Sequence, residues 1–281
     1  FRSQVLDVTS KHILKSASAK GEGVDSILKF QIDEISRAIR RGIALPTLKL
    51  DAPGRKIIDL TTGSMEAYDA YLKASAACDN FFYAEARKLA EKAVAIDPEF
   101  AIAFSLLAEA AGQLRDEPAR AAALEKAKAL SVRATEKERL FIDARYASII
   151  ERDPAKQRRL LEELVTKYPD EKEAHFELGM VYGSVGLVRE AIAANEQAIA
   201  VDPKYGPAIN QLGYLHARVA DFAKAAQYFE RYAELNPGLP NPLDSIAEMN
   251  VFLGNLDEAI ARYRAVLAMK PDFHDSCLGL A

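Results

Sequence analysis

A proline that recurs every 34 residues constrains this chain more than any other feature of its sequence. Pro169, Pro203, Pro237 and Pro271 are separated by equal steps of 34 residues, and the Ala-rich stretch AIAANEQAIAVD stands directly before Pro203. Proline disfavours an α conformation at the residue before it, so a helix ends at each of these points. Its fixed φ then suits a turn that leads into the next helix. We therefore predict stacked helical hairpins that are joined at these prolines.

The same period places small residues at fixed positions. With the proline as the thirty-second place, and with a three-residue insertion at 135–137, the predicted repeats are 67–100, 101–134, 138–171, 172–205, 206–239 and 240–273, followed by the start of a seventh at 274–281. The eighth place holds Ala74, Ala108, Gly179, Gly213 and Ala247, and the twentieth holds Ala86, Ala191, Ala225 and Ala259. Small side chains let two antiparallel helices approach closely, and stacking buries the apolar face that one hairpin cannot bury alone.

Two segments carry a resemblance to a known family. EAHFELGMVYGSVGLVREAIAANEQAIAVDPKY (173–205) and NPLDSIAEMNVFLGNLDEAIARYRAVLAMKPDF (241–273) resemble tetratricopeptide repeats. The resemblance implies a mainly α fold, a right-handed α-solenoid of about six helical hairpins that occupies residues 64–281.

Two of the repeats match the pattern less well. In the second repeat Val132 takes the place of the proline, and in the third Arg145 and Gln157 take the places of small residues. We expect these two repeats to pack irregularly.

The first sixty residues do not repeat. RSQVLDV and HILKSASAK alternate as two strands, and residues 24–43 have apolar residues at helical spacing. We expect a β-hairpin plus helix over 1–44 and an extended linker over 45–63. This order resembles the end of a TolB-like α/β domain, as found before such repeats in bacterial proteins. A partial domain would leave a sheet edge unpaired, which suggests a homo-oligomer formed through the N-terminal strands.

Composition and motifs argue against several functions. The net charge of −4 disfavours a nucleic-acid binder, and no apolar run approaches the length of a membrane span. The sequence has no HExxH, CxxC or phosphate-binding glycine motif, and Cys78 and Cys277 lie far apart. We therefore expect no enzyme activity, cofactor, metal or disulfide framework. We expect a soluble protein, and the sequence does not choose between the cytoplasm and the periplasm.

The resemblance implies a concave groove lined by the first helix of each repeat. By its pattern the partner-binding residues are Tyr71, Tyr146, Phe176, Met180, Asn210, Tyr214, Arg218, Asp244 and Glu248. Aromatic and Met side chains occupy the middle of this set, as at many recognition surfaces, and amides and charges flank them. A second interpretation stays open, in which the aromatic residues only pack neighbouring hairpins against each other.

These observations lead to three hypotheses for function. The first is a scaffold that binds a peptide or protein segment in the concave groove. The second is a sensory or regulatory module of a larger bacterial signalling protein, such as a kinase, a cyclase or a transcription regulator. The third is a self-assembly element that acts through the N-terminal hairpin.

Overall fold

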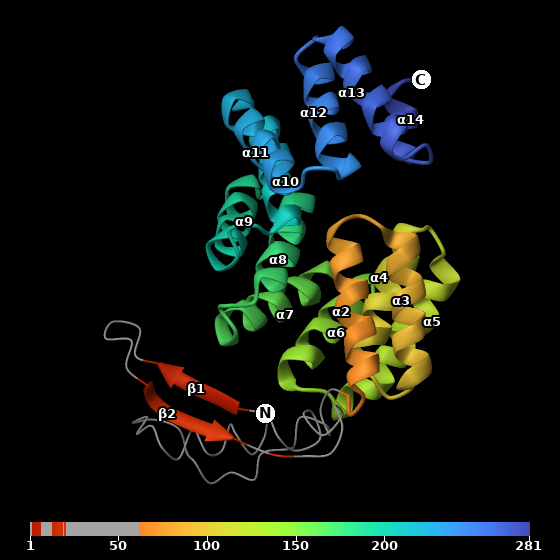
Figure 1. Cartoon of the computed structure of the whole chain (residues 1–281), viewed down its shortest axis with the longest axis vertical. Coiled ribbons are helices and arrows are strands. Elements are labelled where there is room, and N and C mark those ends of the chain that lie inside the picture. The colour runs from red at the N-terminus through yellow and green to blue at the C-terminus, as the bar shows by residue number, and fades with distance from the viewer. Residues whose placement is uncertain (1, 7–12, 19, 21–61) are drawn as a thin grey trace. The chain divides into compact units, whose positions relative to one another are not determined.

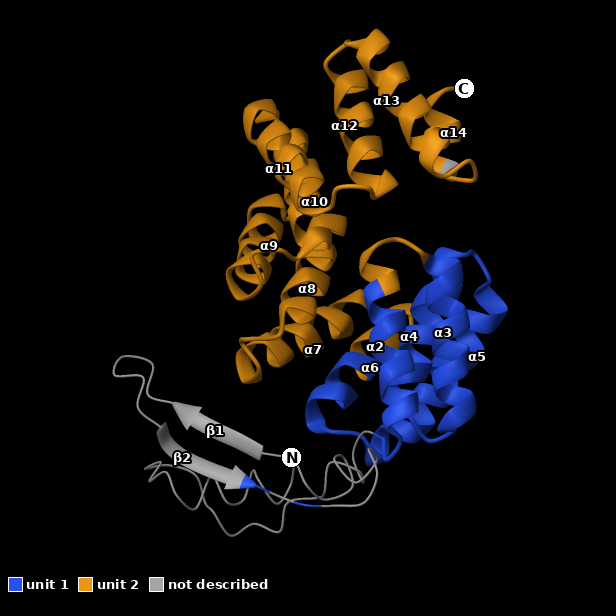
Figure 2. Cartoon of the chain, viewed as in Figure 1, with its two compact units in different colours: residues 1–76, 83–142 blue, residues 77–82, 143–281 orange. Residues whose placement is uncertain are grey.

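The described part of the chain is mainly helical. The computed structural model describes residues 2–6, 13–18, 20 and 62–281, in which thirteen α-helices follow two β-strands (Figure 1). The chain forms two compact units, one made of residues 1–76 and 83–142 and the other of residues 77–82 and 143–281 (Figure 2). This agrees with the expected mainly α repeat fold.

The helices come in pairs that are separated by short turns. The pairs are α2 (Met65–Asp79) and α3 (Tyr83–Ile96), α4 (Ala101–Gln113) and α5 (Glu117–Leu130), α6 (Glu136–Ile149) and α7 (Pro154–Lys167), α8 (Lys172–Ser184) and α9 (Val188–Val201), α10 (Gly206–Arg218) and α11 (Phe222–Leu235), and α12 (Pro240–Phe252) and α13 (Leu256–Met269). The last helix, α14 (His274–Gly279), is short. Between α8 and α14 each helix packs on the next one along the chain, as a stack of hairpins requires.

The turn inside each hairpin has one residue in the left-handed conformation. These residues are Phe81, Arg115, Arg152, Gly186, Ala220 and Gly254, with φ between 54° and 81°. They lie 34 residues apart, except for the 37 residues between Arg115 and Arg152, where the sequence has its three-residue insertion. Only two of the six are glycine, the residue that adopts this conformation at no steric cost.

Backbone hydrogen bonds explain why these turns recur. In the α10–α11 turn, the Asp221 N–H donates to the His216 carbonyl at 2.9 Å and the Ala220 N–H to the Ala217 carbonyl at 3.0 Å. The corresponding pair of bonds is present in the turns of α2–α3, α4–α5, α8–α9 and α12–α13. This pattern is the Schellman motif, which satisfies the last carbonyls of a helix.

Aspartate residues begin three of the second helices. Asp116, Asp153 and Asp221 each accept a hydrogen bond from the backbone N–H three residues later, at 3.1, 2.8 and 3.3 Å respectively. Each therefore serves as the N-cap of its helix, because its carboxylate satisfies a donor that has no partner within the helix.

The positions that the repeat pattern reserves for small residues are buried. Ala74, Ala86 and Ala108 have at most 2% of their surface exposed, as do the later residues of the twentieth place, Ala191, Ala225 and Ala259. A Cβ atom added to the buried Gly213 would lie 2.5 Å from the Phe229 ring, so α10 and α11 approach as closely as the pattern suggests.

The joint between the second and third repeats forms without the proline. A short 3₁₀ helix covers Ser131–Arg133 in its place. Thr135 and Glu138 then form a reciprocal capping box: the Thr135 N–H donates to Glu138 Oε2 at 3.0 Å, and the Glu138 N–H donates to Thr135 Oγ1 at 3.1 Å. The inserted residues thus start α6 by a different local mechanism.

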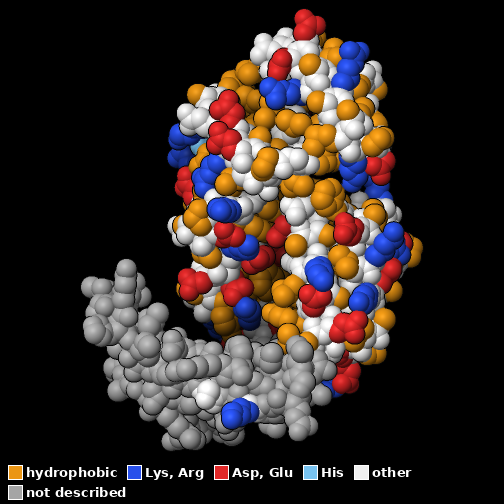
Figure 3. All heavy atoms as spheres, viewed as in Figure 1, with side chains coloured by type: hydrophobic (Ala, Val, Ile, Leu, Met, Phe, Trp, Pro, Cys, Tyr) orange, Lys and Arg blue, Asp and Glu red, His pale blue; other side chains and the backbone are white. Residues whose placement is uncertain are grey.

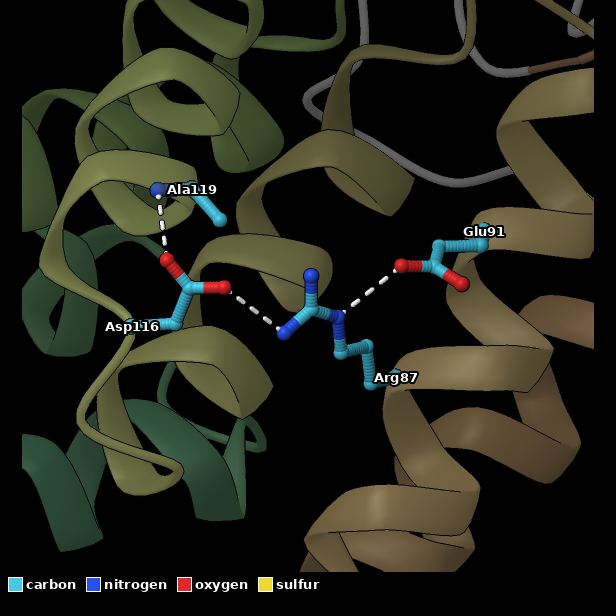
Figure 4. A network of polar contacts seen from close by, with 4 residues as sticks. All are labelled: Arg87, Glu91, Asp116 and Ala119. Carbon is cyan, nitrogen blue, oxygen red and sulfur yellow. Dashed lines mark hydrogen bonds and ion pairs between the residues drawn. The ribbon is translucent and has the colours of Figure 1, made fainter.

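An exposed network joins the first two hairpins. The Arg87 side chain on α3 donates to Glu91 Oε1 and to Asp116 Oδ2, both at 2.9 Å (Figure 4). The second oxygen of Asp116 accepts the Ala119 N–H, and this bond, followed by the Arg87 guanidinium, lowers the pKa of the Asp116 carboxyl. One carboxylate therefore caps α5 and also links α5 to α3.

Near the N-terminus, β1 (Arg2–Leu6) and β2 (Ile13–Ser18) pair antiparallel as a two-stranded sheet, with Arg2 opposite Ser18 and an irregularity at Val5/Leu6. The predicted helix over 24–43 and almost all of the predicted linker over 45–63 lie outside the described residues.

Candidate functional site

The second compact unit contains most of the predicted partner-binding residues. They lie on the first helices of three successive hairpins: Phe176 and Met180 on α8, Asn210, Tyr214 and Arg218 on α10, and Asp244 and Glu248 on α12. We call these seven residues, together with Val251 and Phe252 at the end of α12, the first-helix face.

Three of the predicted aromatic residues pack against neighbouring helices. Phe176 meets Tyr205 edge-on at 5.8 Å between ring centroids, beside the buried core of Ala198 and Ala208. Tyr214 meets Phe229 in the same manner at 5.0 Å. These contacts favour the interpretation in which the aromatic residues stabilise the stack.

The other two predicted residues lie on earlier helices. Tyr71, in the first compact unit, contacts Tyr68 and Phe100 with ring centroids 6.2 and 5.3 Å away. Tyr146 is half-buried on α6. The structure therefore brings together the seven predicted residues of α8, α10 and α12, and Tyr71 belongs to a different local cluster.

A row of side-chain hydrogen bonds connects the first helices of the second unit. Tyr214 Oη lies 2.8 Å from Glu248 Oε2 and 3.2 Å from Ser245 Oγ on α12. Asn210 Nδ2 donates to Asn241 Oδ1 at 3.4 Å, and Ser276 of α14 donates to Asp244 Oδ1 at 2.5 Å.

On its other side, α10 reaches α8. Arg218 Nη1 donates to the Gly183 carbonyl at 3.0 Å. This bond and those to α12 and α14 join residues 31 to 35 positions apart in the sequence, which is about one repeat. They form a polar ladder from hairpin to hairpin.

Burial perturbs two groups in this ladder. Desolvation, with the nearby Glu248 charge second, raises the pKa of the Tyr214 phenol far above its usual value, so the phenol stays protonated and donates its hydrogen bond. Desolvation also raises the pKa of Asp244 to about 6, while the hydrogen bond from Ser276 opposes this shift. Asp275 and Glu248 raise it further through their negative charge.

Part of the first-helix face remains open to solvent. Met180 is 44% exposed, Val251 42% and Phe252 64%, and Arg218 is also exposed. The sequence analysis named Met180 and Arg218 but not Val251 or Phe252. The signal was present, because these two residues occupy the twelfth and thirteenth places that the repeat pattern assigns to the groove.

The remaining candidates for chemistry are structural in the described part of the chain. His175 Nε2 lies 2.8 Å from the Pro169 carbonyl, and the buried His216 ring stacks on Tyr228 at 5.4 Å. Cys78 and Cys277 are free thiols. Among the described residues, no group of three or more His, Cys, Asp or Glu side chains is arranged to hold a metal ion.

The described surface carries mixed charge. On the face seen in Figure 3, acidic and basic side chains alternate with hydrophobic ones over the helices. None of the helices that the structure describes is long and apolar enough to span a membrane.

The comparison with protein families agrees with the hairpin stack. Residues 179–240, which run from α8 to the start of α12, match the family model described as tetratricopeptide repeat. The chain contains tetratricopeptide repeats. The turns, the buried small residues and the paired helices described above are the structural expression of these repeats.

Known proteins extend this result to the fold. The chain is 28% identical over 109 residues to Superkiller complex protein 3 of Mus musculus, an alignment that covers 39% of this chain and only 7% of that protein. Among solved structures, a monomeric mutant of IFIT1 with Gppp-AAAA has a TM-score of 0.58 at 16% identity, over 76% of this chain and 52% of that one. The APC/C hetero-tetramer Cut9-Hcn1 has a TM-score of 0.51 at 17% identity, over 76% and 45% of the two chains. These similarities show the fold.

Proposed function

We propose that this chain is a protein-interaction scaffold whose first-helix face binds a peptide or protein segment. The observation that carries the proposal is the exposure of Met180, Val251 and Phe252 beside the polar ladder. Large apolar side chains that remain exposed next to ordered polar groups are typical of recognition surfaces. The tetratricopeptide repeats support a scaffold role, because stacked repeats provide extended surfaces and leave binding to side chains on one face.

The experiment must separate binding from folding. Replacing Phe176 or Tyr214 by Ala would remove a ring that packs on Tyr205 or Phe229, so lost binding could reflect a damaged core. Met180→Ala and Phe252→Ala change exposed side chains instead. We expect the double variant to bind selected peptides at least tenfold more weakly while its circular dichroism spectrum is unchanged, because exposed anchors supply much of the binding energy.

Val201→Ala provides the matched control for this test. Val201 is also exposed but lies at the end of a second helix, α9. Peptides selected by display against the wild-type chain should bind the control normally. Equal binding by the control and the double variant would place the binding surface elsewhere.

A second candidate function is self-assembly through the N-terminal strands. The specific observation is that β1 and β2 form a sheet of two strands in the described part of the chain. A two-stranded sheet is marginally stable in water, and its edges offer unpaired backbone groups to another strand. Light scattering of the full chain and of a chain without residues 1–44 tests this role, and equal protomer numbers in the two samples would oppose it.

A further inference from the structure

The ladder between α10 and α12 contains more hydrogen-bond acceptors than donors. Asp244 and Glu248 lie one helical turn apart on α12, and both carboxylates are bonded to hydroxyl groups, those of Ser276 and Tyr214. Asp244 is only 5% exposed, whereas Glu248 is half-buried and still reaches solvent. Two carboxylates in this setting place negative charge where water solvates it poorly.

No positive group of the described residues balances these carboxylates. The charges that act on Asp244 come from Glu248 and Asp275, which are both negative. In the part of the chain that the structure describes, neither Asp244 nor Glu248 forms an ion pair. Arg218 shares the first-helix face, but its guanidinium donates to the Gly183 carbonyl in the direction of α8.

A third acceptor points independently to a missing donor. Asn210 is 7% exposed, and its Oδ1 is buried without a hydrogen-bond partner among the described residues. Its amide nitrogen donates to Asn241, so the amide group is directed at α12, one turn before Asp244. A buried acceptor without a donor costs about 1–3 kcal/mol, which a ligand can recover by supplying the donor.

We propose that this acceptor cluster, made of Asn210, Asp244 and Glu248, binds a basic side chain of the segment held on the first-helix face. Arginine fits best because its guanidinium carries five donors and a charge that is permanent, and lysine is the weaker alternative. The inference rests on the proposed function, which supplies the segment. It names the chemistry of the partner: a basic segment, and not one that presents a free carboxylate.

Phe252 supports this assignment from the same helix. It lies one turn beyond Glu248 and is exposed, so its ring is available to the apolar stem of an arginine or lysine. A cation near an aromatic face gains about 0.5–1 kcal/mol at an exposed site. The basic segment would then meet acceptors at one end of α12 and an apolar ring at the other.

The test uses the full chain and display-selected peptides of twelve residues with acetylated and amidated ends. Each arginine or lysine in a bound peptide is replaced by glutamine, and affinities are measured for the wild type, Glu248→Gln and Glu230→Gln. Glu230 is exposed on the second helix α11, so its variant makes the same charge change away from the cluster. We expect one basic position whose loss weakens wild-type binding about tenfold or more, as for a hydrogen bond to a charged group.

Glu248→Gln should remove the preference for that basic position, and Glu230→Gln should keep it. Selected peptides that bind the wild type without any basic preference, or whose preference survives Glu248→Gln, would refute the acceptor cluster and leave the scaffold function standing. A library from which the wild-type chain selects no peptide would overturn both.

Discussion

The left-handed residue in each hairpin turn leads to a prediction about stability that depends on backbone conformation alone. Ala220 has φ +58°, and the equivalent Gly254 has φ +79°. A Cβ atom added at Gly254 would have no other atom within 4 Å, so its substitution brings no steric clash. The pair Ala220→Gly and Gly254→Ala therefore makes the same exchange in opposite directions at equivalent places.

The expected magnitude follows from two opposing effects. A side chain in the left-handed region costs about 1–2 kcal/mol. Glycine loses more conformational freedom on folding, which offsets roughly 0.5–1 kcal/mol of that gain. We expect Ala220→Gly to raise the free energy of unfolding by about 0.5–1 kcal/mol and Gly254→Ala to lower it by a similar amount. In a chain of this size each kcal/mol shifts Tm by about 2–4 °C.

Urea unfolding followed by circular dichroism measures both changes. The double variant should return close to the wild-type midpoint, because sites on different hairpins that share no partner contribute additively within about 0.5 kcal/mol. A loss of stability in Ala220→Gly, or no change in Gly254→Ala, would show that strain at the left-handed residue does not determine the stability of these turns.

Three further predictions concern packing and charge. Gly213→Ala should destabilise the chain by about 1–3 kcal/mol, because its Cβ would meet the buried Phe229 ring at 2.5 Å, whereas Gly183→Ala, with contacts of 3.8–3.9 Å, should be neutral or slightly stabilising; thermal melts of both variants test the difference. Asp244→Asn should gain stability relative to the wild type as the pH rises from about 4 to 6, because folding raises the pKa of Asp244 from 3.8 to about 6 and so disfavours its ionised form; denaturation midpoints that keep a constant difference between pH 4 and pH 7 would contradict this. Glu177→Gln should cost roughly 2 kcal/mol in urea unfolding, because it weakens a partly buried ion pair whose guanidinium on α6 lies 2.9 Å away; an unchanged midpoint would show that this pair contributes little.

The sequence predicted the helical repeat fold because its signals are local. A proline ends a helix through its own ring, and a small residue permits close approach wherever it stands. The left-handed turns were less accessible, since Phe81, Arg115, Arg152 and Ala220 carry no signature of that conformation. Hydrogen bonds of the Schellman motif impose it on them, and these bonds follow from the helix ends on both sides.

The candidate site was predictable in position but not in chemistry. The repeat pattern indicated which residues of α8, α10 and α12 share a face. It could not show that Tyr214 donates to Glu248 or that Asn210 meets Asn241, because these contacts depend on how far one hairpin is displaced against the next. The partner-binding role of these residues stays a prediction, as does the role of the chain within a larger bacterial signalling protein.

The polar ladder has a mechanical consequence. Each of its hydrogen bonds joins only adjacent hairpins, so pulling on the ends of the second unit would load these bonds one after another, as in a spring built from separate coils. Side chains such as Tyr214 would then set the stiffness of the spring, while the buried small residues set the strength of each coil. A bound segment that lies across several coils would stiffen the spring without changing the shape of any single hairpin.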